Sequence, residues 1–128
     1  MTATRNLFLL CALFVFAGVM HFVIPDSYVG IMPPWVPRQL ELVYLSGVLE
    51  IVGGLALLHN RTRRAAGAGL ILLLIAVFPA NVQMLMNAMA RNASQLEIAL
   101  LWARLPFQPL LIVWTYRAAI RRRVASIP

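Results

Sequence analysis

Two charged side chains occur inside long apolar runs of the sequence, where they could form an ion pair or bind a polar group. Glu50 lies in the apolar run 41–58 and Arg104 lies in the run 96–117. Counted from the ends of these runs by the rise of an α-helix, both residues are about 12–14 Å deep. A charged side chain at such a depth costs ~2.5–3.5 kcal/mol or more, so each should face protein and seek a partner. We therefore predict that Glu50 and Arg104 pair with each other.

Uncharged polar residues occur in the same apolar runs. Asn81 follows Pro79, whose missing N–H should disrupt the helical ladder and leave backbone groups to be satisfied. Each predicted helix thus contributes at least one polar side chain to a candidate site. The members of this candidate site are His21, Glu50, Asn81, Arg104 and Gln108. Two interpretations are open: a closed network that only fixes the helix arrangement, and a polar pocket that binds a small ligand.

Several other chemistries find little support in the sequence. Cys11 is the only cysteine, which excludes an intramolecular disulfide and a Cys-x-x-Cys redox pair within this chain. His21 and His59 fall at opposite ends of the first two predicted helices, so they cannot ligate the same haem iron. No spacing is typical of a metal site or of a nucleophile beside its base. We predict no catalytic or metal-binding residues, no evident cofactor, and no enzyme activity of the chain on its own.

The composition of the chain indicates a membrane protein. Of its 128 residues, 62% are hydrophobic and only 12% are charged, and the mean hydropathy is +0.83. A helix needs about 20 apolar residues to cross a bilayer, and four runs approach that length. They are 6–24, 41–58, 65–87 and 96–117. The predicted fold is an all-α integral membrane four-helix bundle that forms one domain over residues 1–128, with the first run kept as a helix because no small-x-small cleavage site follows it.

The distribution of arginine predicts the orientation of this bundle. The sequence contains eleven arginines and no lysine. A four-pass arrangement puts most of them on one side, namely Arg5, Arg61, Arg63, Arg64, Arg117, Arg121, Arg122 and Arg123. Only Arg38 and Arg91 fall on the other side, so both termini are predicted to be cytoplasmic. The four apolar runs leave no soluble basic face for nucleic acid, and the aromatic, proline-rich loop 25–40 should lie at the outer headgroup level, as a lid or a simple anchor.

Several short motifs, in order, resemble those of a known family. They are His21-Phe22, Pro25-Asp26, Pro33-Pro34, Tyr44-Leu45-Ser46-Gly47 with Glu50, Gly53-Gly54, Phe78-Pro79-Ala80-Asn81 and Arg104-Leu105-Pro106-Phe107-Gln108. Together they resemble the DoxX-like family of small four-helix membrane proteins over about residues 7–116. The resemblance implies a membrane bundle loosely associated with redox systems, although most members of that family have no established activity.

The resemblance and the polar residues together give a functional expectation. We expect a DoxX-like integral membrane protein of undefined activity, in the bacterial inner membrane, whose polar pocket binds a quinone-like ligand or organises a membrane partner. The alternative is a membrane subunit of a quinone-linked, sulfur-oxidising enzyme. The expected partners are the lipid bilayer, a redox or assembly protein of the membrane, and a second copy of the chain. Small-solute transport is a weaker hypothesis, because the sequence shows no inverted repeat.

Overall fold

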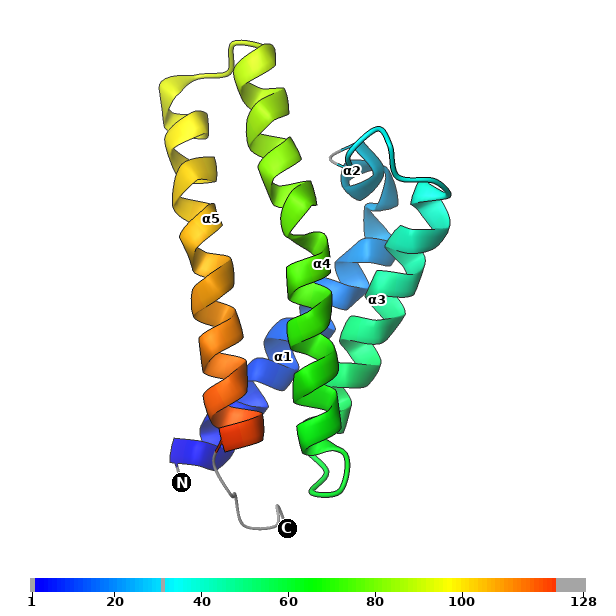
Figure 1. Cartoon of the computed structure of the whole chain (residues 1–128), viewed down its shortest axis with the longest axis vertical. Coiled ribbons are helices and arrows are strands. Elements are labelled where there is room, and N and C mark those ends of the chain that lie inside the picture. Colours follow the sequence, from blue (N-terminus) through cyan, green and yellow to red (C-terminus); the bar gives the residue numbers. More distant parts are fainter. Residues whose placement is uncertain (1, 31, 122–128) are drawn as a thin grey trace.

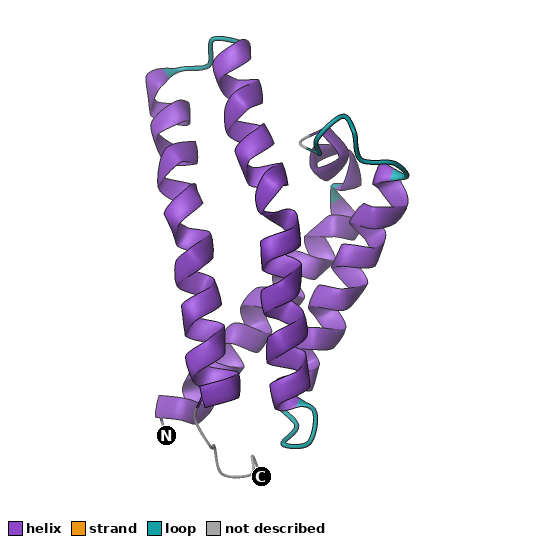
Figure 2. Cartoon of the chain, viewed as in Figure 1, coloured by secondary structure: helices purple, strands orange, loops and turns teal. Residues whose placement is uncertain are grey.

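The computed structural model describes residues 2–30 and 32–121, and within these ranges every regular element is helical (Figure 2). Arg122 and Arg123, which the charge pattern assigned to the cytoplasmic side, lie outside the described residues. The elements, labelled in Figure 1, are α1 (Thr2–Val23), α2 (Pro25–Gly30), α3 (Gln39–Ala56), α4 (Arg63–Ala90), α5 (Gln95–Thr115) and a final π-helical turn, η1 (Tyr116–Arg121). The prediction of an all-α chain with four long helices is confirmed.

The four long helices are the four predicted apolar runs with shifted ends. Each is long and apolar enough to cross a membrane. Every one begins before the apolar run that predicted it, and α4 also continues beyond it as far as Ala90. The extensions arise because a helical backbone tolerates polar residues that a hydropathy limit excludes, whereas α1, α3 and α5 end one or two residues before their runs do, within the usual spread of helix boundaries. Pro79 does not interrupt α4 either, since a proline inside a membrane helix is tolerated when neighbouring groups satisfy the freed backbone.

The predicted lid contains a short helix that the apolar pattern did not predict. Helix α2 begins at Pro25 and has Asp26 in its first turn. Proline suits the first helical position because its N–H would be unpaired there in any case, and an acidic residue in the first turn favours the helix dipole. Gly30 ends the helix. The loop 25–40 is therefore partly ordered by its own sequence.

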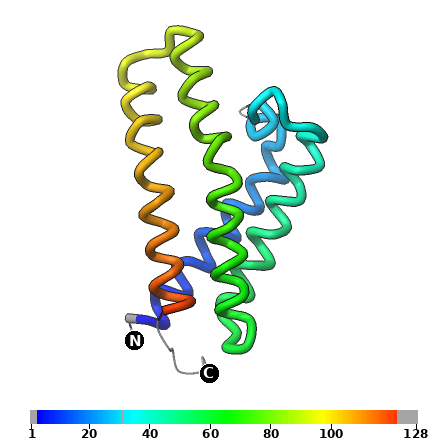
Figure 3. Tube along the Cα trace, in the orientation of Figure 1, coloured from blue at the N-terminus to red at the C-terminus, as the bar shows by residue number. Residues whose placement is uncertain are grey.

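The long helices form two pairs that meet at one end of the molecule. Helix α1 packs along α3, α4 packs along α5, and α3 also contacts α4. Figures 1 and 3 show the pairs closest at the end that holds the start of α1 and η1, the closed end, and farther apart at the end that holds α2, the lid end. The main core lies at the closed end, where η1 contacts α1 and α4. Its buried residues are Leu7, Leu10, Phe14, Leu57, Leu70, Leu74, Leu111, Ala118 and Ala119.

Helices α1 and α3 approach each other closely at two glycines. A Cβ atom added to Gly18 would lie 2.7 Å from the carbonyl oxygen of Gly47, and one added to Gly47 would lie 2.9 Å from the carbonyl oxygen of Gly18. Small residues let the backbones of neighbouring membrane helices come this close. The crossing fixes the position of α3, and with it the position of Glu50, about one turn further along that helix.

Two side chains at the start of α4, from its N-cap Thr62 and its first residue Arg63, cap the end of α3. Arg63 is buried, and its Nε donates to the carbonyl oxygen of Leu57 at 2.8 Å. The Oγ1 of Thr62 donates to the carbonyl oxygen of Ala56 at 2.7 Å. The last carbonyls of a helix have no partner within the helix and need such donors. Arg63 therefore caps α3, and it also adds a positive charge to the end of the bundle that holds most of the arginines.

We expect Arg63→Ala to lower the free energy of unfolding by about 1.5–3 kcal/mol, because it removes a charged hydrogen-bond donor from buried carbonyls. Chemical denaturation of the purified protein in detergent measures the change. The matched control is Arg64→Ala, since Arg64 is exposed and should contribute within about 0.5 kcal/mol. Equal losses for the two variants would contradict the capping role.

Candidate functional site

A cavity of about 780 Å³ lies between the α1/α3 pair and the α4/α5 pair, beneath α2 and the loop that follows it. Its walls are mainly apolar, with a few polar side chains from α1, α2, α3, α4 and α5. These polar side chains are His21, Tyr28, Ser46, Glu50, Asn81, Arg104 and Gln108. All five residues of the sequence-derived candidate site therefore line one cavity.

Glu50 lies beside His21 on the α1/α3 wall. The His21 Nδ1 is 3.3 Å from Glu50 Oε2, and each of the two side chains is 10% exposed. The hydrogen bond of Nδ1 goes to the carbonyl oxygen of Ala17, at 2.7 Å. Because a carbonyl only accepts, Nδ1 is the ring nitrogen that carries the hydrogen. Glu50 Oε2 has no hydrogen-bond partner among the described residues, so a buried carboxyl oxygen is available in the cavity wall.

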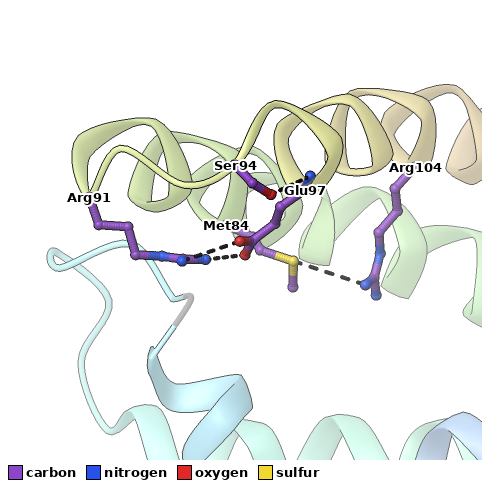
Figure 4. A network of polar contacts seen from close by, with 5 residues as sticks. All are labelled: Met84, Arg91, Ser94, Glu97 and Arg104. Carbon is purple, nitrogen blue, oxygen red and sulfur yellow. Dashed lines mark hydrogen bonds and ion pairs between the residues drawn. The ribbon is translucent and has the colours of Figure 1, made fainter.

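The predicted ion pair between Glu50 and Arg104 is wrong. Among residues 2–30 and 32–121, no acidic side chain pairs with Arg104, whose Nη1 instead lies 4.0 Å from the sulfur of Met84 on α4 (Figure 4). Equal depth along two helices says nothing about the direction in which each side chain points around its helix. The carboxyl group is directed toward α1, and the guanidinium lies on the α4/α5 side of the cavity. The two charges therefore belong to separate walls.

Two amides connect α4 to α5. Asn81 Nδ2 donates to Gln108 Oε1, and Gln108 Nε2 donates to the carbonyl oxygen of Leu74. Leu74 lies just over one turn before Pro79, in the part of α4 whose backbone ladder the proline disturbs. Gln108 is buried, and these two bonds satisfy both its amide oxygen and its amide nitrogen. For this pair the structural interpretation of the polar residues is the better supported one.

Helix α2 covers the Glu50–His21 wall. The ring of Tyr28 stacks on the ring of His21, with centroids 3.9 Å apart and planes inclined by 19°. Burial raises the pKa of the Tyr28 phenol, the Glu50 carboxylate raises it further, and the Arg104 guanidinium opposes both. The phenol therefore experiences both charges of the cavity. The sequence pattern indicated only an interfacial aromatic residue at Tyr28 and missed this position.

The lid is also connected to α4. Asn87 Nδ2 donates to the carbonyl oxygen of Gly30 at 3.2 Å, and Gln83 Nε2 donates to Asn87 Oδ1 at 2.9 Å. Asn87 was not among the predicted site residues. It is 57 positions from Gly30 in the sequence, and no local pattern indicates such a contact.

The α4–α5 connection has its own ion pair, at the end of the molecule that holds α2. Arg91 donates to both carboxylate oxygens of Glu97, and the backbone N–H of Glu97 donates to Ser94 Oγ at 3.2 Å as a helix cap (Figure 4). Both charged side chains are largely exposed. This pair orders the connection between the helices and does not line the cavity.

The fold and the cavity define a class of protein: an all-helical chain with four helices long and apolar enough to cross a membrane, and with a charged cavity between two helix pairs. The chain belongs to the family described as a domain of unknown function (DUF8561), whose model matches residues 10–119. The matched segment contains every residue that lines the cavity. No curated protein and no solved structure matches the chain. The DoxX-like resemblance stays a prediction.

Proposed function

We propose that this chain is a multi-pass membrane protein that binds a small quinone-like molecule in the cavity between its helix pairs. The observation that carries the proposal is the cavity itself, whose volume of about 780 Å³ is combined with apolar walls and one charged side chain on each side. Sites for small organic ligands have volumes of about 300–1,000 Å³, mostly apolar walls and a few polar groups that orient the ligand. The cavity has each of these properties.

The outer surface of the helices supports insertion in a bilayer. Large apolar side chains such as Phe16, Leu72 and Leu110 are each about two-thirds exposed, at 66%, 68% and 66%. Water would make such a surface unfavourable, whereas lipid would not.

The charges at the two ends support an orientation. The closed end carries Arg5, Arg61, Arg64, Arg117 and Arg121. The lid end carries the acidic residues Asp26, Glu41 and Glu97 together with Arg38 and Arg91. By the positive-inside rule, both termini face the cytoplasm and the lid faces the opposite side of a bacterial inner membrane.

A ligand of this cavity can come from the lipid phase. Leu45, Leu49 and Phe107 line the cavity and are also 52%, 47% and 55% exposed. The apolar wall therefore continues onto the lipid-facing surface of α3 and α5. A quinone joins a flat ring that bears oxygen atoms to a long apolar tail, so the ring could occupy the cavity while the tail stays in the bilayer. The resemblance to the DoxX-like family favours a quinone among such molecules.

Arg104 is the residue best placed to orient such a ring. It lines the cavity and has no acidic partner among the described residues. A guanidinium donates several hydrogen bonds and also stacks on flat π systems, and the ring oxygens of a quinone accept hydrogen bonds. Asn81 and Gln108 keep this wall in place, because they hydrogen-bond to each other and Gln108 on α5 also bonds to the backbone of α4.

Native mass spectrometry of the protein, purified gently from its own membrane and followed by lipid extraction, tests the proposal. We expect a quinone to co-purify with the wild type. Arg104→Gln should retain about ten-fold less of it, because a hydrogen bond to a charged group contributes about 1.5–3 kcal/mol. The control is Arg91→Gln, which removes a charge at the same end but outside the cavity. Retention of phospholipid alone by all three proteins would contradict the proposal.

A further inference from the structure

The buried oxygen of Glu50 determines which chemical form of the ligand fits the cavity. We infer that the cavity selects the reduced, hydroxyl-bearing ring, a hydroquinone, over the oxidised quinone. In this arrangement one ring hydroxyl donates to Glu50 Oε2, and the oxygen at the opposite edge of the ring accepts from Arg104. The inference rests on the proposed function and adds the redox state of the ligand to it.

Glu50 Oε2 requires a hydrogen-bond donor. The side chain is nine-tenths buried and lines the cavity, and Oε2 has no hydrogen-bond partner among the described residues. A buried acceptor without a donor is costly to leave unpaired. A ligand that brings a hydrogen-bond donor to this oxygen therefore binds more tightly than a ligand that does not.

His21 does not supply this donor. Its Nδ1 hydrogen is directed to the carbonyl oxygen of Ala17, although the nitrogen itself lies only 3.3 Å from Oε2. The stacked ring of Tyr28 holds the imidazole against this wall. Nδ1 therefore does not donate to Oε2, and this carboxylate oxygen is left to accept a hydrogen bond from a ligand.

The two redox forms of the ring differ in what they offer to Glu50. An oxidised quinone ring has carbonyl oxygens, which only accept hydrogen bonds, so at Glu50 two acceptors would face each other. A hydroquinone has an O–H at each of these positions. At the other wall, the oxygen of either form can accept from the Arg104 guanidinium. The discrimination therefore comes from Glu50, and sites that bind a hydroxyl through hydrogen bonds reject analogues that lack it.

The test uses the full chain in nanodiscs of defined phospholipid, without oxidant, and a matched probe pair: decylubiquinone and its hydroquinone, decylubiquinol, under anaerobic conditions. Equilibrium dialysis measures the two dissociation constants. We expect the wild type to bind the hydroquinone at least about ten-fold more tightly. Glu50→Gln places an amide donor at this wall, so the ratio should fall to about one or invert, with quinone binding equal or stronger.

The matched control is Glu41→Gln, which changes an exposed carboxyl group on the same helix, outside the cavity, and should keep the wild-type ratio. If the wild type binds the two probes with equal dissociation constants, the inference is overturned and the proposed function stands. The same holds if the wild type prefers the quinone, which is the result that a protonated Glu50 would give. Absence of binding for both probes overturns the proposed function itself. The wild-type ratio distinguishes these outcomes even where Glu50→Gln fails to fold.

Discussion

Substituting leucine for Gly18 should separate α1 from α3 and lower the free energy of unfolding by about 3 kcal/mol or more, at the upper end of the range for overpacked sites. The added Cβ would lie 2.7 Å from the carbonyl oxygen of Gly47 and 2.7 Å from Cγ1 of Ile51. The isoleucine side chain can rotate, but the carbonyl belongs to the backbone of α3, so relief requires movement of the whole helix. Thermal unfolding followed by intrinsic tryptophan fluorescence measures the loss.

Gly69→Leu is the control for this prediction. A Cβ atom added to Gly69 on α4 meets nothing within 4 Å, and leucine is a better helix former than glycine by roughly 0.5–1 kcal/mol. This variant should be as stable as the wild type or slightly more stable. If Gly18→Leu were no less stable than Gly69→Leu, the close crossing of α1 and α3 would be contradicted.

Filling the cavity should abolish ligand binding without unfolding the protein. Ala80 lies on α4, is partly exposed and lines the cavity. In Ala80→Trp, the indole would occupy the space that the ring of a ligand needs, and the cavity volume of about 780 Å³ gives it room. We expect at least about 100-fold weaker binding, equivalent to about 2.7 kcal/mol, in the dialysis assay with decylubiquinol.

Ala68→Trp is the matched change on the same helix. Ala68 is exposed and does not line the cavity, so the added indole should face lipid and leave the dissociation constant unchanged. Thermal unfolding of both variants shows whether each still folds. Unaltered binding by a folded Ala80→Trp protein would place the ligand elsewhere.

The long helices could be predicted from the sequence because a bilayer requires an apolar segment of a certain length, and hydropathy reports that directly. The connections could not be predicted as well. The helix that begins at Pro25 depends on local signals, a proline and an acidic residue in its first turn, which hydropathy does not detect. The arginine distribution predicted that Arg63 lies at the end of the bundle that holds most of the arginines. Its hydrogen bonds to the end of α3 could not be predicted, because they depend on the backbone path between α3 and α4.

The candidate site was predictable in its members and less so in its contacts. Depth along a helix follows from counting residues, and the polar residues grouped in this way all line one cavity. The rotation of each helix about its axis does not follow from counting. Glu50 is therefore beside His21, and the predicted partner Arg104 lies on the other wall. The position of Tyr28 over His21 depends on how α2 folds back, which no spacing in the sequence encodes.

The most direct measurement is a crystal structure of the protein in a lipid phase with a quinol analogue brominated on its ring, located by anomalous scattering. We predict a bromine peak in the cavity between Glu50 and Arg104, beneath Tyr28. Peaks confined to the lipid-facing surface of the helices, with the cavity empty of ligand, would contradict the proposal that this chain binds a quinone-like molecule between its helix pairs.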